Sequence, residues 1–189
     1  AGSDASVART AASAKSDGGE PAQPRAGAPA QATVTPGHIV VRGTIYYTDR
    51  LGDRNHPAAG VRVEIWDRDQ QFPATGDKLA ETVTDADGRF VSREITNVDP
   101  DGPTRSPEGT QDLFLKLVTD SGTIRLLQSG TNQPYDWTSY EINERNGQMR
   151  NVPDGIVGFP TQYIVEHTPH VEALWTYVNM AEAWHFVRD

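Results

Sequence analysis

The sequence predicts a mainly β protein: an antiparallel β-sandwich preceded by a disordered N-terminal leader and followed by a C-terminal α-helix. Three observations predict it. Short runs of β-branched and aromatic residues, separated by turn residues, recur between residues 38 and 128. No helical pattern interrupts these runs, which favours a sandwich over alternating βαβ units. The first 35 residues have a different composition altogether.

Residues 1–35 are expected to form a flexible tether. Of these residues, 22 are Ala, Gly, Ser or Pro, and the large apolar side chains are Val7 and Val34. Such a segment buries too little apolar surface to offset the entropy lost on ordering. It begins Ala-Gly-Ser-Asp and continues as low-complexity sequence, as exported chains do after signal cleavage. An extracytoplasmic location, secreted or on the cell surface, is therefore expected; the alternative is an arbitrary starting point.

Residues 36–128 are expected to form the sandwich domain. Its first strand, 38–48, places its large apolar side chains on one alternating face: Ile39, Val41, Ile45 and Tyr47. Gly43 interrupts that face, which predicts a bulge or a close approach of another segment. The second strand, 61–67, alternates in the same way and directs Trp66 outward, either for binding or, as we expect, for packing under a later segment.

The remaining strands of the domain follow at short intervals. They are expected at 78–84, 89–96, 112–119 and 123–128. Thr84-Asp85-Ala86-Asp87-Gly88 is a tight hairpin signal, since Asp and Gly supply the backbone angles of a short turn. Asp120-Ser121-Gly122 predicts a second hairpin, joining 112–119 to 123–128.

The last third of the chain lacks the strand pattern of residues 38–128. Residues 129–168 are expected to be an irregular excursion, because their aromatic residues are scattered among Asn, Gly, Pro and Asp. Residues 169–189 are expected to form a helix, with Thr168 as cap and Pro169 at its first position. That helix is apolar around nearly its whole circumference, which predicts burial. It either docks on the sandwich or contacts a partner domain.

Three segments carry a family resemblance. They are VRGTIYY leading into PAAGVRVEIWD, then KLAETVTDADGRF, and then an acidic loop running into QDLFLKLVT. Together, over residues 38–128, they resemble the transthyretin-like and carboxypeptidase regulatory-like sandwich domains. The resemblance implies an immunoglobulin-like two-sheet fold and a non-catalytic accessory role. The Tyr-Arg-Gly-Ser-type tail of the branch that hydrolyses 5-hydroxyisourate is absent, so that activity is not implied.

The terminal segment ALWTYVNMAEAWHFVRD carries a second resemblance. It is similar to the helix that leads into the catalytic domain of secreted zinc metallopeptidases. The zinc-binding His-Glu-x-x-His is absent from the 189 residues, so this resemblance implies a peptidase-like domain further along a longer chain.

Charge and composition exclude several classes of partner. The net charge is −9, and Lys and Arg form no cluster, which argues against nucleic acid. No apolar run approaches the length of a membrane span. With no cysteine, the chain has neither a disulfide framework nor a thiolate metal site.

Acidic turns provide the candidate calcium ligands. Calcium takes six to eight oxygen ligands, which the two acidic loops could supply together if they lay at the same end of the sandwich. The candidates are Asp85, Asp87, Asp99, Asp101 and Asp112, with Glu108 beside them. The alternative is structural, since Asp favours turns by bonding its own backbone.

Two histidines provide the other metal candidate. His167 and His170 have a His-x-x-His spacing, beside Glu166 and Glu172. A zinc site needs three or four fixed ligands, and Pro169 lies between these two histidines. A capping or surface role is the simpler interpretation.

No catalytic motif is present, whether a nucleophile elbow, a phosphate loop or a local Ser/His/Asp arrangement. The leading hypothesis is a non-catalytic accessory or interaction module of a secreted or cell-surface protein, with a partner domain contacting residues 171–189. The alternative is a stand-alone secreted binding protein for a small ligand or glycan, stabilised by calcium in one version. A third possibility is an enzyme in its own right.

Overall fold

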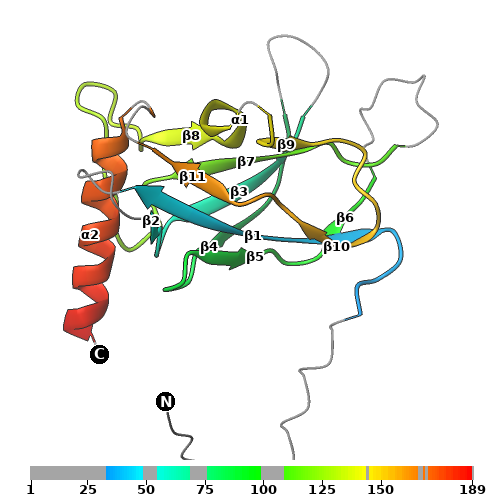
Figure 1. The fold of residues 1–189 in the computed structure, drawn as a ribbon, viewed down its shortest axis with the longest axis horizontal. Helices are drawn as coiled ribbons and strands as arrows, with labels where there is room; N and C mark the ends of the chain where they lie inside the picture. Colours follow the sequence, from blue (N-terminus) through cyan, green and yellow to red (C-terminus); the bar gives the residue numbers. More distant parts are fainter. Residues whose placement is uncertain are drawn as a thin grey trace, which may run out of the picture. The chain divides into compact units, whose positions relative to one another are not determined.

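The computed structural model describes residues 33–48, 55–68, 76–98, 109–143, 145–165, 168 and 170–188. The predicted tether, 1–35, lies outside this part of the chain except for its last three residues. Within the unit Thr33–Asp189, two β-sheets form two layers, and a helix lies across one end of them (Figure 1). The predicted mainly β sandwich with a C-terminal helix is confirmed.

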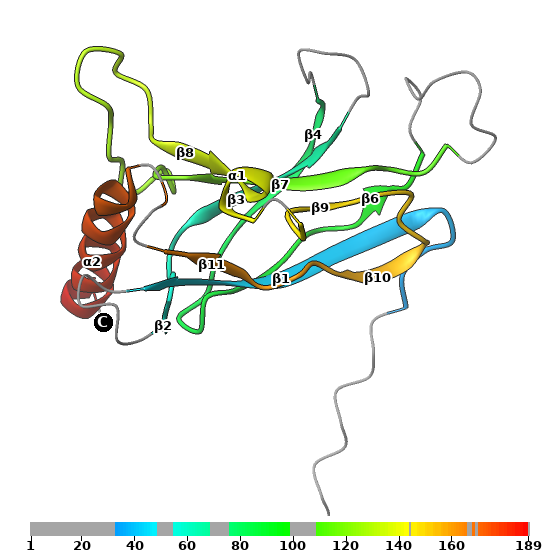
Figure 2. The ribbon, with the colours of Figure 1, turned by 45° about the horizontal axis from the view of Figure 1, so that its top comes forward.

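Sheet one is built around the long strand β1 (His38–Thr48). Two strands pair with β1 in parallel along one side: β10 (Gly155–Gly158) and β11 (Gln162–Ile164). Three short strands pair with it antiparallel along the other side: β2 (Asn55–Pro57), β5 (Arg89–Val91) and β6 (Ile95–Thr96). β1 is therefore the central strand of this layer, as Figure 2 shows.

Sheet two is antiparallel. Its strands run in the order β4 (Lys78–Val83), β3 (Arg62–Asp67), β7 (Leu113–Val118) and β8 (Asp136–Thr138). The short strand β9 (Gln148–Met149) also pairs with β7. The single-turn helix α1 (Ser139–Ile142) follows β8, and the Glu141 carboxylate caps it by accepting from the Thr138 backbone N–H at 2.8 Å.

The inward faces of the two sheets form the core that the alternation predicts. The buried inward residues of the predicted strands 38–48, 61–67 and 112–119 are Ile39, Val41, Ile45, Tyr47, Val61, Val63, Ile65, Leu113, Leu115 and Leu117. Gly43 lies opposite Phe90 in an unbroken register, so no bulge forms there. A Cβ at Gly43 would lie 2.7 Å from the Phe90 ring. The close approach predicted at Gly43 is thus made by the Phe90 side chain.

The turn at residues 84–88 forms, but its flanking strands are not a hairpin. β4 pairs with β3 in sheet two, whereas β5 pairs with β1 in sheet one. The turn therefore carries the chain from one layer to the other. The hairpin prediction is wrong because a turn motif specifies only local backbone angles, while the strand partners are chosen by the packing of both layers.

The second predicted hairpin is also wrong. Residues 123–128 form no ladder strand and contribute only isolated bridges, Asp120 with Arg125 and Leu127 with Pro134. The partners of β7 are instead β3, β8 and β9. Residues 136–138, as β8, pair antiparallel with β7 where 123–128 was predicted to pair.

The prediction that residues 129–168 form an irregular excursion is also wrong. This segment contains β8, α1, β9, β10 and β11, and it completes both sheets. The sandwich accordingly extends to Ile164 rather than ending at Gln128. Its strands are two to four residues long and lie among Gly, Asn and Pro, so they carry no periodic signal.

The C-terminal helix α2 (Val171–Arg188) starts later than the predicted entry at Thr168 and Pro169. Pro169 lies outside the described residues. His170 has φ 56°, so it cannot be part of the helix, and the Thr168 carbonyl accepts the Val171 N–H at 3.2 Å. In the part of the chain that the structure describes, no helix has the length and apolarity needed to cross a bilayer.

Candidate functional site

The first half of α2 docks on the sandwich. Its buried side chains are Val171, Leu174, Tyr177, Val178 and Ala181. Two hydrogen bonds fix its position: Trp175 Nε1 donates to the Thr48 carbonyl at 2.8 Å, and the Tyr177 hydroxyl donates to the Gly60 carbonyl at 3.1 Å. Of the two alternatives left open for this helix, docking on the sandwich is the one observed for its N-terminal half.

The last turns of α2 are uncovered. Their exposed large apolar residues are Met180, Trp184, Phe186 and Val187, which we call the α2 tip. Phe186 is 89% exposed and Val187 80% exposed, although both are apolar. The burial predicted for the whole helix is therefore incomplete, because it holds for the first half of α2 and not for these last turns.

The α2 tip continues into a small groove against the sandwich. Trp184 and Ala181 form one wall, and the groove has a volume of about 160 Å³. The other wall comes from Gly60, Val83, Ser121, Thr123 and Ile124. Val83 is itself 46% exposed, so apolar surface extends from the tip onto the end of β4.

A second hollow lies on the outer face of sheet one, over the middle of β1. Its volume is about 370 Å³, and its lining residues are Arg42, Gly43, Thr44, Arg89, Phe90, Val91, Gly158 and Phe159. Arg42 and Arg89 are exposed at its rim. No sequence pattern indicates this site, because its residues come from β1, β5, β10 and Phe159 after β10, and they meet only when these segments pair.

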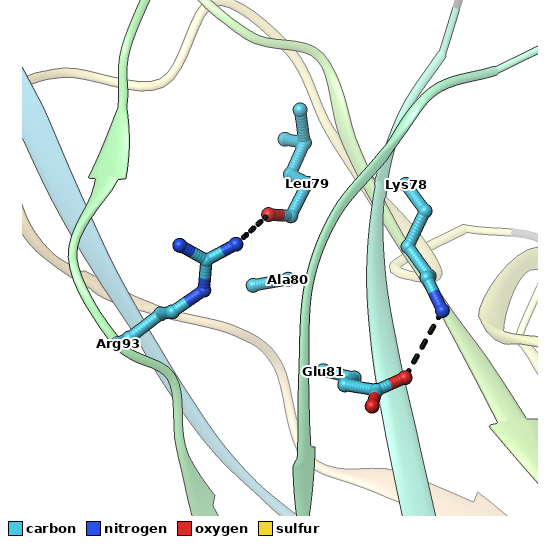
Figure 3. Close-up of a pocket in the computed structure, with 5 residues that line it drawn as sticks. All are labelled: Lys78, Leu79, Ala80, Glu81 and Arg93. Atoms are coloured by element: carbon cyan, nitrogen blue, oxygen red, sulfur yellow. Dashed lines mark hydrogen bonds and ion pairs between the residues drawn. The ribbon is translucent and has the colours of Figure 1, made fainter.

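A third hollow, of about 350 Å³, lies where the edge of sheet two faces Arg93 (Figure 3). The Lys78 ammonium and the Glu81 carboxylate form a 3.0 Å ion pair, and Arg93 Nη2 donates to the Leu79 carbonyl at 3.2 Å. The hydrogen bond between Lys78 and Glu81 raises the pKa of Lys78 and lowers that of Glu81. Lys78 and Glu81 thus neutralise each other, while Arg93 bonds a backbone carbonyl. Charged side chains on an edge strand protect it against unwanted pairing.

The two aspartates of the 84–88 turn serve the turn itself. Asp85 Oδ1 accepts the backbone N–H of Asp87 at 2.9 Å and that of Arg89 at 2.8 Å. Asp87 pairs with the Arg89 guanidinium. Both carboxylates therefore have partners within the turn, as expected if these aspartates stabilise the turn.

Asp112 lies at the other end of the sandwich. Arg62 pairs with Val118 at the end of the β3–β7 ladder near the 84–88 turn, and Asp67 pairs with Leu113 at the opposite end. Asp112 directly precedes Leu113, so six residues of strand, about 20 Å, separate it from the end near the turn. Its Oδ1 accepts the Asn151 N–H at 2.7 Å.

The remaining calcium candidates, Asp99, Asp101 and Glu108, lie outside the described residues. Within the described ranges, no group of three or more His, Cys, Asp or Glu side chains is placed to hold a metal ion. The structure thus separates Asp112 from Asp85 and Asp87 instead of bringing these calcium candidates together.

Of the two histidine candidates, His170 alone is described. Its ring lies 5.4 Å from the ring of Tyr135, and its side chain is exposed immediately before α2. His167 and Glu166 lie outside the described residues. The described contacts of His170 are those of a surface ring that packs at a helix entry.

Trp66 packs on the outer face of sheet two. Its ring stacks on Phe114 at 6.2 Å, and Phe114 meets Tyr140 of α1 edge-on at 5.6 Å. Trp66 Nε1 also donates to Glu64 Oε2 at 3.0 Å. Tyr140 lies within residues 129–168, the later segment under which Trp66 is expected to pack, so this geometry matches the packing interpretation of Trp66.

Comparisons with known proteins give no family. No family model matches the chain, and no curated protein matches it. Among solved structures, the chain is similar to a 9R-lipoxygenase from Cyanothece PCC8801, with 20% identity and a TM-score of 0.41, over 68% of this chain and 16% of that one. It is also similar to an (S)-allantoin synthase, with 11% identity and a TM-score of 0.32, over 67% of this chain and 41% of that one.

These likenesses are too low to carry a function. The matched part spans well under two thirds of either protein. They also give no support to the transthyretin-like resemblance of residues 38–128, which stays a prediction from the sequence.

Proposed function

We propose that this chain is a non-catalytic interaction module of an extracytoplasmic protein, and that it docks a partner protein domain through the α2 tip. The observation that carries this proposal is the division of α2 into two halves. Leu174 and Tyr177 are fully buried against the sandwich, whereas Phe186 and Val187 of the same helix are almost fully exposed. A helix that continues its apolar surface past its own docking site offers that surface to another protein.

A different protein domain suits the tip better than a second copy of this chain. The net charge of −9 opposes self-association, because two copies would bring like charges together. The tip itself has aromatic and aliphatic anchors, Trp184, Phe186 and Val187, beside the apolar groove at Val83. Aromatic anchors beside a groove are typical of the centre of a protein interface.

The absence of catalysis is part of the same proposal. The candidate ligands that the structure describes are engaged in the fold: Asp85 and Asp112 accept backbone N–H groups, and His170 packs on Tyr135. Turnover of a peptide or ester substrate by the purified chain, with or without added zinc or calcium, would contradict this part.

Site-specific photo-crosslinking tests the docking surface. The variant Phe186→p-benzoylphenylalanine, expressed in the cells that produce the protein, should yield one adduct of discrete mass with a different protein or domain. The matched control, Thr131→p-benzoylphenylalanine, places the same group on an exposed loop and should not yield that adduct. An equal adduct pattern for both variants, or an adduct with the mass of two copies of this chain, would overturn the proposal.

A further inference from the structure

The hollow on the outer face of sheet one is produced by strand register. Arg42 of β1 lies between Gly158 of β10 on one side and Val91 of β5 on the other. Thr44, the next outward residue of β1, pairs with Arg89. These five residues therefore share the outer face, and the missing side chain at Gly158 opens the floor of the hollow.

Gly158 is not required by packing. A Cβ built at this position meets no atom within 4 Å, and its backbone does not lie in the left-handed region. A glycine in a strand lowers stability relative to alanine, since it loses more backbone entropy on folding. The fold therefore keeps an open space at Gly158 that a side chain would fill, which is typical of a strand approached closely by a ligand.

Two guanidinium groups flank this space. Arg42 and Arg89 are diagonal neighbours on adjacent strands, a spacing that long side chains bridge easily. Arg89 pairs with Asp87, whereas Arg42 forms no ion pair or hydrogen bond with its side chain among the described residues. The chain as a whole has a net charge of −9, whereas this hollow has an exposed cationic side chain that is available to a ligand.

The surface on both sides of the hollow is apolar and aromatic. Val91 is 58% exposed, and Ile156, which pairs with Val40, is 44% exposed. At the other end, Tyr46 and Tyr163 are cross-strand partners whose rings stack at 5.7 Å. The outward row of β1 from Val40 to Tyr46 spans about 20 Å, long enough for an extended ligand.

We infer that this face binds an acidic saccharide, a chain of sugar rings that bear carboxylates. The Arg42 guanidinium supplies a planar fork of N–H donors, which matches a carboxylate. The apolar Val91 and Ile156 side chains suit the C–H faces of sugar rings, and Thr44 and the tyrosines supply hydroxyl groups. This inference gives a location to the ligand-binding function suggested by the sequence, and it does not depend on the α2 tip.

Other extended ligands fit less well. A peptide that adds as a strand needs a sheet edge, whereas this hollow lies over the central strand of its sheet. Nucleic acid needs a row of cations along its phosphates, and two arginines over a 20 Å row, about the length of six residues of strand, do not supply one.

Calorimetry with the full 189-residue chain tests the inference. The probes are an oligosaccharide of galacturonic acid, a galactose oligosaccharide of equal length, and polyglutamate. We expect binding of the first, weaker binding of the neutral chain, and no binding of polyglutamate. Amide chemical shifts should change at Arg42, Val91 and Gly158 on titration with the acidic saccharide.

Matched variants locate the site. Arg42→Gln removes the fork, and Gly158→Val places a side chain in the hollow where a Cβ meets no atom within 4 Å. Each should weaken binding by about tenfold or more. Arg150→Gln removes an equal charge from an exposed position next to β9 of sheet two and should leave the affinity unchanged. Circular dichroism and the melting temperature confirm that each variant is folded.

Three results would overturn the inference. They are the absence of binding to the acidic saccharide, equal binding of polyglutamate or of the neutral chain, and affinity that survives both Arg42→Gln and Gly158→Val. None of these results bears on the crosslinking test at Phe186, so the two proposals fail separately.

Discussion

The hydroxyl group of Tyr177 donates a 3.1 Å hydrogen bond to the carbonyl oxygen of Gly60, although 117 residues separate them in the chain. This bond joins α2 to the residues that enter β3, and Tyr177 is fully buried around it. A Cβ at Gly60 would lie 3.0 Å from the Cβ of Ala181, so the helix and this turn are in close contact. The first half of α2 is accordingly part of the folded domain.

Tyr177 should make the stability of the protein sensitive to alkaline pH. Burial raises the pKa of Tyr177, and its contact with Ser121 opposes this shift. A raised folded-state pKa means that the stabilising contribution is fully present below the unfolded-state pKa, about 10, and is lost as pH rises through the folded-state pKa. Urea unfolding followed by tryptophan fluorescence should show this loss above about pH 10.

The variant Tyr177→Phe is the control for that effect. It should cost about 1 kcal/mol at neutral pH, because the Gly60 carbonyl loses its donor. Its stability should then fall less steeply than that of the wild type above about pH 10. Parallel pH profiles for the two proteins would contradict the assignment.

Shortening a side chain should lower the stability of the protein strongly in the first half of α2 and hardly at all in its last turns. Leu174→Ala removes a fully buried side chain and should lower the free energy of unfolding by about 2 to 5 kcal/mol. Phe186→Ser changes a side chain that is 89% exposed and should shift it by less than about 0.5 kcal/mol. Chemical denaturation measures both, and a large loss for Phe186→Ser would show that this residue packs within the domain.

Replacing two glycines of sheet one with alanine should change the stability of the protein in opposite directions. Gly43→Ala places a Cβ 2.7 Å from the Phe90 ring and should cost about 1 to 3 kcal/mol. Gly158→Ala meets open space and should stabilise the strand by up to about 1 kcal/mol. Melting temperatures of the two variants provide the comparison, and equal effects would refute the packing difference.

Asp85 should matter for folding and not for calcium. Asp85→Ala deprives the backbone N–H groups of Asp87 and Arg89 of their acceptor and should cost about 1 to 2 kcal/mol. Asp85→Asn keeps an acceptor oxygen and should recover part of that loss. The cost of Asp85→Ala should be the same in calcium and in chelator; a cost that appears only in calcium would identify Asp85 as a ligand.

The sequence by itself determined the elements whose pattern repeats over many residues. Alternation along 38–48, 61–67 and 112–119 identifies the buried faces of β1, β3 and β7, because every second side chain of a strand points to one layer. The apolar run after Thr168 identifies α2 in the same way, through helical spacing. The Asp and Gly of residues 84–88 identify a turn, because they meet a local backbone requirement.

The tertiary structure alone decided which strands pair and which surfaces remain open. β10 and β11 lie more than 100 residues beyond β1 in sequence and are three or four residues long, so their register with β1 has no local signal. The hollow at Arg42 and Gly158 depends on that register. The exposure of the α2 tip depends on where the sandwich ends beneath the helix. Periodicity reports which side of an element is apolar, whereas partners and edges arise from hydrogen bonds and packing between distant segments.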